Sequence, residues 1–103
     1  VAFMRGADAA CISRIMQTAL GNVAGLFCDG AKGNCATKVA MALHSAMQSM
    51  LLAECGFAAD EYHGIVGDTV EHTIENFYKI QREGMNNIMD VLYHIEVEKN
   101  HIC

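Results

Sequence analysis

Two cysteines, Cys28 and Cys35, stand on either side of a short segment that contains two glycines. Thiolate sulfur ligates soft metals and iron–sulfur clusters, and it also forms disulfides. Gly30 and Gly33 would each cost a helix interior roughly 1 kcal/mol relative to alanine. Residues 28–35 therefore predict a tight loop between helices, with both thiols directed at a shared partner.

The spacing of this cysteine pair leaves three interpretations open. The thiols can be buried side chains around a connector, can ligate a metal or cluster, or can form a redox disulfide. In a continuous helix the two Cα atoms would lie about 10 Å apart, which is a long reach for one metal centre. A glycine turn brings them closer and lets backbone N–H groups approach a bound anion.

The composition predicts the fold class. The chain has 103 residues, of which 52% are hydrophobic, and it contains no proline. This length suits one domain with a modest core, and the absence of the strongest helix breaker favours helices throughout. We predict an all-α fold, a small bundle of about four helices, with the glycine-containing cysteine loop between the first two. Residues 1–103 are expected to form a single helical domain.

Charge and cysteine usage argue against several classes of partner. The net charge is −5 and the seven Lys and Arg residues are scattered, so the chain has no clustered basic patch for nucleic acid. No stretch approaches the roughly 18 consecutive apolar residues of a membrane span. Five cysteines at irregular positions do not resemble a disulfide framework and predict a reducing compartment, the cytoplasm.

Because the chain starts at Val1 in apolar sequence, we expect it to be part of a longer chain.

Capping residues and helical periodicity place the four helices. The first is expected to begin after Asp8 and the second at Asn34, both good N-caps. The third follows a capping box over 68–71, and the last begins near Asn87. The second helix, apolar over most of its circumference, is expected to be central and to bury His44. The residues predicted to form buried faces are Ile12, Ile15, Met16, Ala19, Leu20 and Val23, then Val39, Leu43, Met47, Met50 and Leu51, then Val70, Ile74, Phe77 and Ile80, and finally Ile88, Val91, Leu92 and Ile95.

The run Asn22-Val23-Ala24-Gly25-Leu26-Phe27-Cys28-Asp29-Gly30-Ala31-Lys32, closed by Cys35-Ala36, resembles the cluster-binding signature of iron–sulfur L-cysteine desulfidases. This group overlaps the UPF0597 family and is related to the alpha part of iron–sulfur L-serine dehydratases. Later residues resemble that family's C-terminal helices in order and spacing, namely Gly64-Ile65-Val66-Gly67, Glu71, Thr73-Ile74, Asn76 and Glu83-Gly84-Met85. The resemblance covers nearly the whole chain, which is therefore expected to be the C-terminal fragment of a longer lyase.

The resemblance implies a cofactor and its ligands. Family members bind a [4Fe–4S] cluster through three cysteines, and Cys28 and Cys35 match the last two. Gly30 and Gly33 lie between them and are assigned to the cofactor-binding loop. The first ligand belongs to an upstream part that this chain lacks, and Cys11 does not match it. The cluster is thus expected in the full-length protein and weakly held or absent in this fragment.

Three further residues are candidates for roles near such a cluster. Asp29 and Lys32 could orient the substrate or support the cluster electrostatically, and a structural ion pair is the open alternative. Cys103 ends a short polar tail that we expect to be mobile, so its thiol could act as a removable fourth ligand. An exposed thiol without a role is the alternative for Cys103. The resemblance assigns no catalytic base in this chain.

The function implied by the resemblance is β-elimination of L-cysteine to pyruvate, ammonia and sulfide, or of L-serine to pyruvate and ammonia. The later residues match the cysteine enzymes better. The implied partners are a small amino-acid substrate, the missing N-terminal part of the same chain and a homo-oligomer. The isolated fragment is expected to be inactive as a lyase. The alternatives are a non-catalytic helical binding or assembly module with the same fold, and a small redox or zinc protein.

Overall fold

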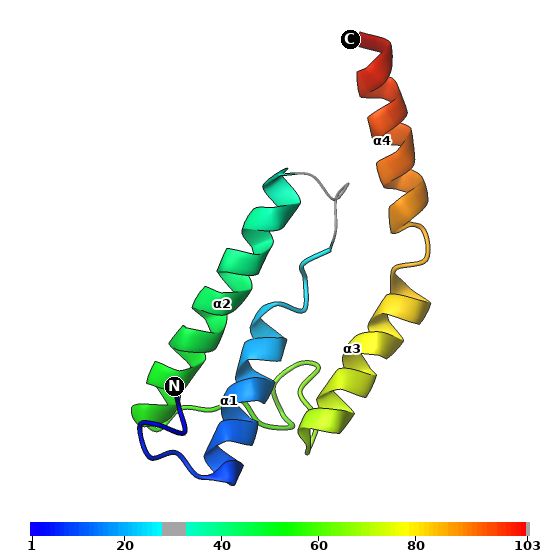
Figure 1. Cartoon of the computed structure of the whole chain (residues 1–103). Helices are drawn as coiled ribbons and strands as arrows, with labels where there is room; N and C mark the ends of the chain where they lie inside the picture. Colours follow the sequence, from blue (N-terminus) through cyan, green and yellow to red (C-terminus); the bar gives the residue numbers. More distant parts are fainter. Residues whose placement is uncertain (28–32, 103) are drawn as a thin grey trace.

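The computed structural model of the protein describes residues 1–27 and 33–102, with side chains described as far as residue 99. These residues form four α-helices and no strand: α1 (Ala9–Asn22), α2 (Gly33–Glu54), α3 (Val70–Gly84) and α4 (Ile88–Ile102). The helices α1 and α2 run antiparallel, and α3 leads into α4, which extends beyond the other three (Figure 1). The predicted all-α fold of four helices is confirmed.

Side chains at the helix starts explain where α1 and α3 begin. The Asp8 carboxylate caps α1 and accepts a hydrogen bond from the backbone N–H of Cys11 at 2.8 Å. Helix α3 is capped by Thr69, which accepts from the N–H of His72 at 3.0 Å. The predicted capping box was therefore wrong by one residue. With Thr69 as the cap, Glu71 is only the second helical residue and does not occupy the third position that the box requires.

The bounds of α2 differ slightly from the prediction. The helix begins at Gly33, one residue before the expected Asn34, and ends at Glu54. Cys55 therefore lies in the turn that follows the helix. Gly56 ends this turn with φ of +90°, a conformation that side chains with a Cβ rarely adopt.

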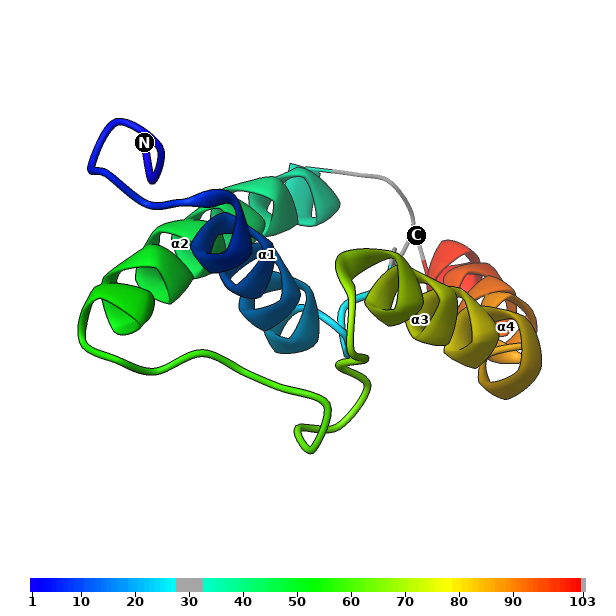
Figure 2. The same ribbon diagram turned by 90° about the horizontal axis from the view of Figure 1, so that it is seen from below.

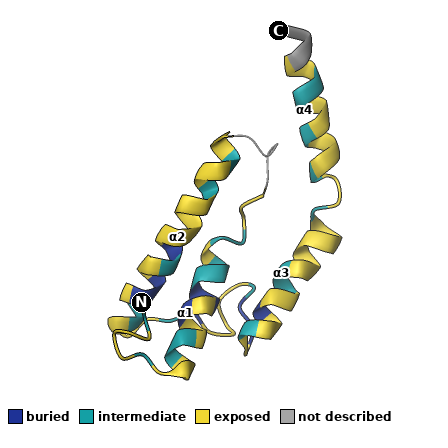
Figure 3. Ribbon diagram, viewed as in Figure 1, coloured by how far each residue is buried: buried dark blue, intermediate teal, exposed yellow. Residues whose placement is uncertain are grey.

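The helix at the centre of the structure is α1. It packs against both α2 and α3, and Figure 2 shows it between them. The predicted central position of α2 was wrong, because α2 packs only on α1 among the described helices. Figure 3 shows the buried residues gathered at one end of the molecule, away from α4. The buried side chains are Ile15, Gln17, Thr18, Ser45, Ser49, Met50, Ala59, Val66 and Thr73.

Of the residues predicted to form buried faces, only Ile15 and Met50 are buried, and about half of the set is exposed. On α2, Val39 is 72% exposed and Leu43 is 66% exposed, and His44 is exposed as well. The buried residues of α2 are Ser45, Ser49 and Met50, so small hydroxyl side chains form much of the buried side of the helix. The larger apolar side chains stay exposed because no other described helix covers them. Further residues predicted to be buried are also exposed, namely Met16, Met47, Leu51, Ile74, Ile80, Val91 and Ile95.

The molecule is elongated. Its radius of gyration is 16.7 Å and it measures 55 × 27 × 16 Å. A compact domain of this length would have a radius of gyration of about 13 Å. Large apolar side chains such as Val39, Leu43 and Met89 are exposed along its helices. None of the four helices, as far as they are described, has the length and apolar character to cross a membrane.

Candidate functional site

Of the residues predicted to bind the cofactor, Cys35 and Gly33 lie in the described structure. Gly33 is the first residue of α2, and Cys35 follows in the first turn with its thiol half-buried. The other predicted site residues lie outside the described residues, namely Cys28, Asp29, Gly30, Lys32 and Cys103. The structure describes the residues on either side of 28–32, and these show what lies around the cysteine loop.

The remaining cysteines lie at the other end of the structure. Cys11 is in the first turn of α1 and Cys55 follows the last turn of α2. Because α1 and α2 are antiparallel, both cysteines stand at the end of the helix pair opposite Cys35 (Figure 1). Neither can share a metal centre with Cys35 in this arrangement.

Lys38 contacts the residue at which the cysteine loop starts. Its Nζ donates a hydrogen bond to the carbonyl oxygen of Phe27 at 2.6 Å and lies 5.7 Å from the centre of the Phe27 ring. Phe27 directly precedes Cys28. Lys38 was not expected from the sequence to lie near the cysteine loop. What could have indicated Lys38 in the sequence is its position three residues after Cys35, because residues at this spacing lie on one face of a helix.

Phe27 also faces the junction of α3 and α4. It lines an apolar groove of about 260 Å³ together with Phe77 and Ile88. A neighbouring groove of about 410 Å³ contains Phe27 and the polar side chains of Glu83 and Asn87. Phe27, the residue before the cysteine loop, therefore contacts α2 through Lys38 and lines grooves beside the α3–α4 junction.

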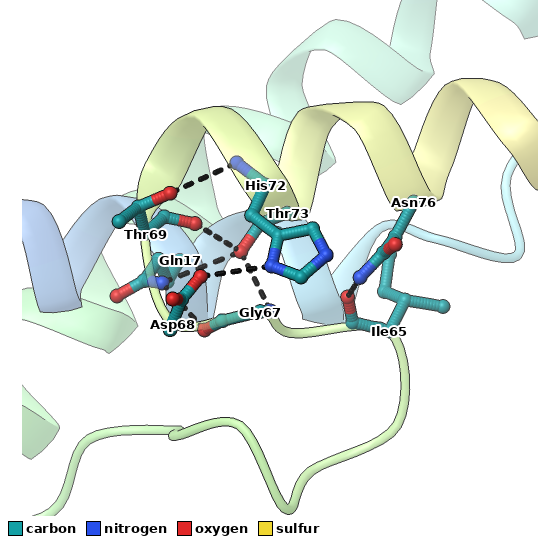
Figure 4. A network of polar contacts seen from close by, with 8 residues as sticks. All are labelled: Gln17, Ile65, Gly67, Asp68, Thr69, His72, Thr73 and Asn76. Atoms are coloured by element: carbon teal, nitrogen blue, oxygen red, sulfur yellow. Dashed lines mark hydrogen bonds and ion pairs between the residues drawn. The ribbon is translucent and has the colours of Figure 1, made fainter.

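A buried hydrogen-bond network holds the connector between α2 and α3 (Figure 4). The Thr73 hydroxyl is fully buried, accepts from the backbone N–H of Gly67 at 3.0 Å and donates to the Thr69 carbonyl at 2.9 Å. The Gln17 amide donates to the Gly67 carbonyl at 2.9 Å and to the Thr73 hydroxyl at 3.3 Å. Both lone pairs and the proton of Thr73 are used, so this hydroxyl joins α1, the connector and α3.

Two further side chains fix the same connector. The Asn76 amide donates to the Ile65 carbonyl at 2.9 Å, and the Thr18 hydroxyl accepts from the N–H of Ala59 at 2.9 Å. The residues from Gly64 to Asn76 that carry the family resemblance therefore form one structural unit. They set the position of α3 relative to α1 and do not form a cluster of reactive groups. Gln17 and Thr18 were missed, because nothing in the sequence around them indicates a partner some 40 to 50 residues away.

Gly67 leaves room for the His72 ring. A Cβ at Gly67 would lie 2.8 Å from His72 Cγ, closer than a real Cβ contact. The His72 Nδ1 lies 2.8 Å from an oxygen of Asp68, and a second pair joins His63 and Asp60 at 2.7 Å. Both pairs are exposed. Within residues 1–27 and 33–99, no three His, Cys, Asp or Glu side chains gather as a metal site.

The hydrogen bond from His72 lowers the pKa of Asp68 below its ordinary value of 3.8. A depressed carboxyl pKa stabilises the folded state above the unfolded pKa, and this contribution is lost as the pH falls through the folded pKa. We expect His72→Ala to return the pKa of Asp68 towards 3.8, and His63→Ala to leave it unchanged. A ¹³C NMR titration of the Asp68 carboxyl measures this, and an equal pKa with and without His72 would contradict it.

Comparison with known proteins identifies the family of this chain. The sequence model of the serine dehydratase alpha chain matches residues 1–92. The chain belongs to the serine dehydratase alpha chain family. This family assignment and the UPF0597 relatives confirm the resemblance to the UPF0597 family and to the alpha part of serine dehydratases.

Several UPF0597 proteins are similar to this member of the serine dehydratase alpha chain family. The one from Alkaliphilus oremlandii is 44% identical over 85 residues, which are 82% of this chain and 20% of the relative. The one from Oleidesulfovibrio alaskensis is 41% identical over 88 residues, or 85% of this chain and 21% of the relative. The one from Clostridium perfringens is 33% identical over 99 residues, which are 96% of this chain and 23% of the relative. The chain spans about a fifth of the length of these relatives, and no solved structure matches it.

Proposed function

We propose that this chain is the cluster-anchoring domain of a [4Fe–4S]-dependent amino-acid lyase. The reaction is β-elimination of L-cysteine to pyruvate, ammonia and sulfide, or of L-serine to pyruvate and ammonia. The observation that carries the proposal is the half-buried Cys35 in the first turn of α2, with the residue before Cys28 held to the same helix by Lys38. The serine dehydratase alpha chain match supports the same reaction class.

The donor chemistry of the chain fits part of a cluster site. Cys28 and Cys35 would supply two thiolates, and the third would come from protein outside this chain. The N-terminus of α2, where Cys35 lies, carries partial positive charge that favours an anionic group. When bound, the cluster would supply a Lewis-acidic iron with an open coordination position.

Residues of this chain would hold the substrate near that centre. Asp29 and Lys32 are our candidates for orienting the substrate ammonium and carboxylate groups, because both follow Cys28 within a few residues. Cys103 remains a candidate removable ligand. The network around Thr73 would act at a distance by fixing α3, which with Phe27 lines the groove at the α3–α4 junction. L-cysteine is favoured as the substrate by the match of residues 64–85 to the desulfidases.

The exposed apolar faces support the proposed partners. The relatives are about five times longer than this chain, and their remaining residues would supply protein to cover α2 and α4. We propose that these faces pack against the N-terminal part of a family-length chain or in a homo-oligomer, in the reducing environment of the cytoplasm. The same faces also favour a second candidate function, a non-catalytic assembly module with this fold.

Anaerobic reconstitution tests the proposed function. A family-length chain that carries this segment is treated with iron and sulfide, and pyruvate is measured with L-cysteine and with L-serine. We expect pyruvate from both, faster with L-cysteine, and none from residues 1–103 alone, because this fragment carries two of the three ligands. Absence of turnover in the iron-loaded full-length chain would favour the assembly module. Turnover by the fragment alone would contradict the proposal that the third cluster ligand lies outside this chain.

A further inference from the structure

A hollow of about 400 Å³ lies between the first turns of α1 and the end of α2. Its walls are mostly small or apolar, and they carry two charged side chains of opposite sign. The lining residues include Asp8, Cys11, Arg14, Ala53, Phe57 and Ala58. Small-molecule sites have volumes of roughly 300–1,000 Å³ and combine apolar walls with a few polar groups. Because Cys11 lines it, the hollow lies at the end of the α1–α2 pair away from Cys35.

Two other carboxylates near the hollow are already engaged. Glu54, at the end of α2, accepts two hydrogen bonds from the guanidinium of Arg5. Asp60 accepts from the backbone N–H of Tyr62 at 3.0 Å and lies 2.7 Å from Nδ1 of His63. Neither carboxylate therefore occupies the charged groups that line the hollow.

Asp8 and Arg14 retain hydrogen-bonding groups for a ligand. Asp8 uses Oδ1 to accept from the backbone N–H of Cys11, and within the described part of the chain no group bonds to its Oδ2. Arg14 interacts with Asp60 through its charge, but its guanidinium makes no hydrogen bond within residues 1–27 and 33–99. The hollow thus offers carboxylate acceptors on one side chain and several N–H donors on another. A ligand that carries both an ammonium and a carboxylate group complements this pair.

We propose that the hollow binds a small α-amino acid, with the ligand carboxylate on Arg14 and the ligand ammonium on Asp8. Arginine binds carboxylates through charge-assisted hydrogen bonds that are often bidentate. The Phe57 ring forms an apolar wall and is held edge-on by His63, with ring centres 6.0 Å apart and planes at 83°. Phe57 is 46% exposed, so a ligand can enter from solvent. The site is separate from Cys35, and the inference does not depend on the cluster.

Titration of the 103-residue chain with L-serine, followed by ¹H–¹⁵N NMR, tests the inference. We expect the amide signals of residues 8–14 and 53–58 to shift. The hollow is open and two charged groups hold the ligand, so the dissociation constant should be on the order of 1 mM. Ethanolamine lacks the carboxylate of serine, and 3-hydroxypropanoate lacks its ammonium group. Each should bind at least about tenfold more weakly than L-serine.

Asp8→Asn and Arg14→Gln each remove one charge from the hollow. Asparagine caps helices about as well as aspartate, so Asp8→Asn keeps the start of α1. Arg14 is exposed, so Arg14→Gln should leave the fold unchanged, and far-UV circular dichroism checks both variants. Each variant should weaken L-serine binding about tenfold through the loss of a charge-assisted hydrogen bond. Arg82→Gln on α3 is the matched control and should leave binding unchanged, since Arg82 is an exposed arginine on another helix.

Three results would overturn the inference. The first is the absence of shifts around the hollow at about 20 mM L-serine, well above the expected dissociation constant. The second is equal binding by the parent, Asp8→Asn and Arg14→Gln proteins. The third is a set of shifts confined to the residues around Cys35, which would place the amino acid at the proposed lyase centre. If a family-length chain holds no cluster, the proposed function fails, and this titration still decides whether the hollow binds an amino acid.

Discussion

Cys28→Ser and Cys35→Ser are each expected to abolish the visible absorbance of the cluster and the lyase activity of a family-length chain. Cluster ligation needs thiolate sulfur, and a serine hydroxyl does not replace it at neutral pH. Cys35 is the ligand whose position is described, half-buried in the first turn of α2. Absorbance and pyruvate formation are measured on the anaerobically reconstituted proteins. We expect both signals to fall to the level of the protein without iron.

Cys11→Ser and Cys55→Ser are the matched controls for these substitutions. Both residues lie at the end of the α1–α2 pair away from Cys35, and Cys55 is exposed. Serine at these positions should leave the absorbance and the activity close to those of the parent chain. Equal losses from all four substitutions would show that the cysteines contribute to packing and not to ligation.

Thr73→Val is expected to destabilise the 103-residue chain by about 2 kcal/mol. Valine keeps the shape of threonine but removes the hydroxyl that accepts from the Gly67 N–H and the Gln17 amide. A buried donor left without a partner costs roughly 1–3 kcal/mol. Urea unfolding followed by circular dichroism measures the change in the free energy of unfolding.

Thr37→Val is the control for this stability prediction. The Thr37 hydroxyl donates to the Asn34 carbonyl, and the side chain is exposed in the first turns of α2, where water can replace the partner. We expect a change of less than about 0.5 kcal/mol. If Thr37→Val and Thr73→Val destabilised the chain equally, the network in Figure 4 would not hold the connector in the way described.

The sequence predicted the features of this fold that depend on local chemistry. Asp8 caps α1 as expected, and the four helices follow from apolar periodicity in a chain without proline. The capping box failed by one residue because Asp68 and Thr69 are both good caps; in the structure Thr69 caps the helix and Asp68 pairs with His72. Local sequence patterns therefore predict the helices, with errors of about one residue at the helix ends.

The buried faces and the buried network depend on long-range contacts and were predicted poorly. Periodicity shows that Val39 and Leu43 share an apolar face, but it does not say what covers that face. The buried side of α2 is instead formed largely by small residues such as Ser45. Gln17 contacts Gly67 across 50 residues of sequence, and no local pattern encodes such a pair.

The candidate site was predicted in part. Cys35 was expected as a ligand from the family resemblance, since its spacing to Cys28 left other interpretations open, and its ligation stays a prediction. Lys38 was not expected, because a lone lysine on a helix is usually a solvated charge. Its hydrogen bond to the Phe27 carbonyl joins residues 11 apart, and no local sequence pattern indicates it.

The iron and acid-labile sulfide content of a reconstituted family-length chain tests the central claim most directly. The protein is purified anaerobically after reconstitution, and both elements are counted per chain in the parent and in Cys35→Ser. Our account predicts about four iron and four sulfide per parent chain and a near-complete loss of both in Cys35→Ser. Full pyruvate formation from L-cysteine by protein stripped of iron, or an unchanged iron content in Cys35→Ser, would contradict it.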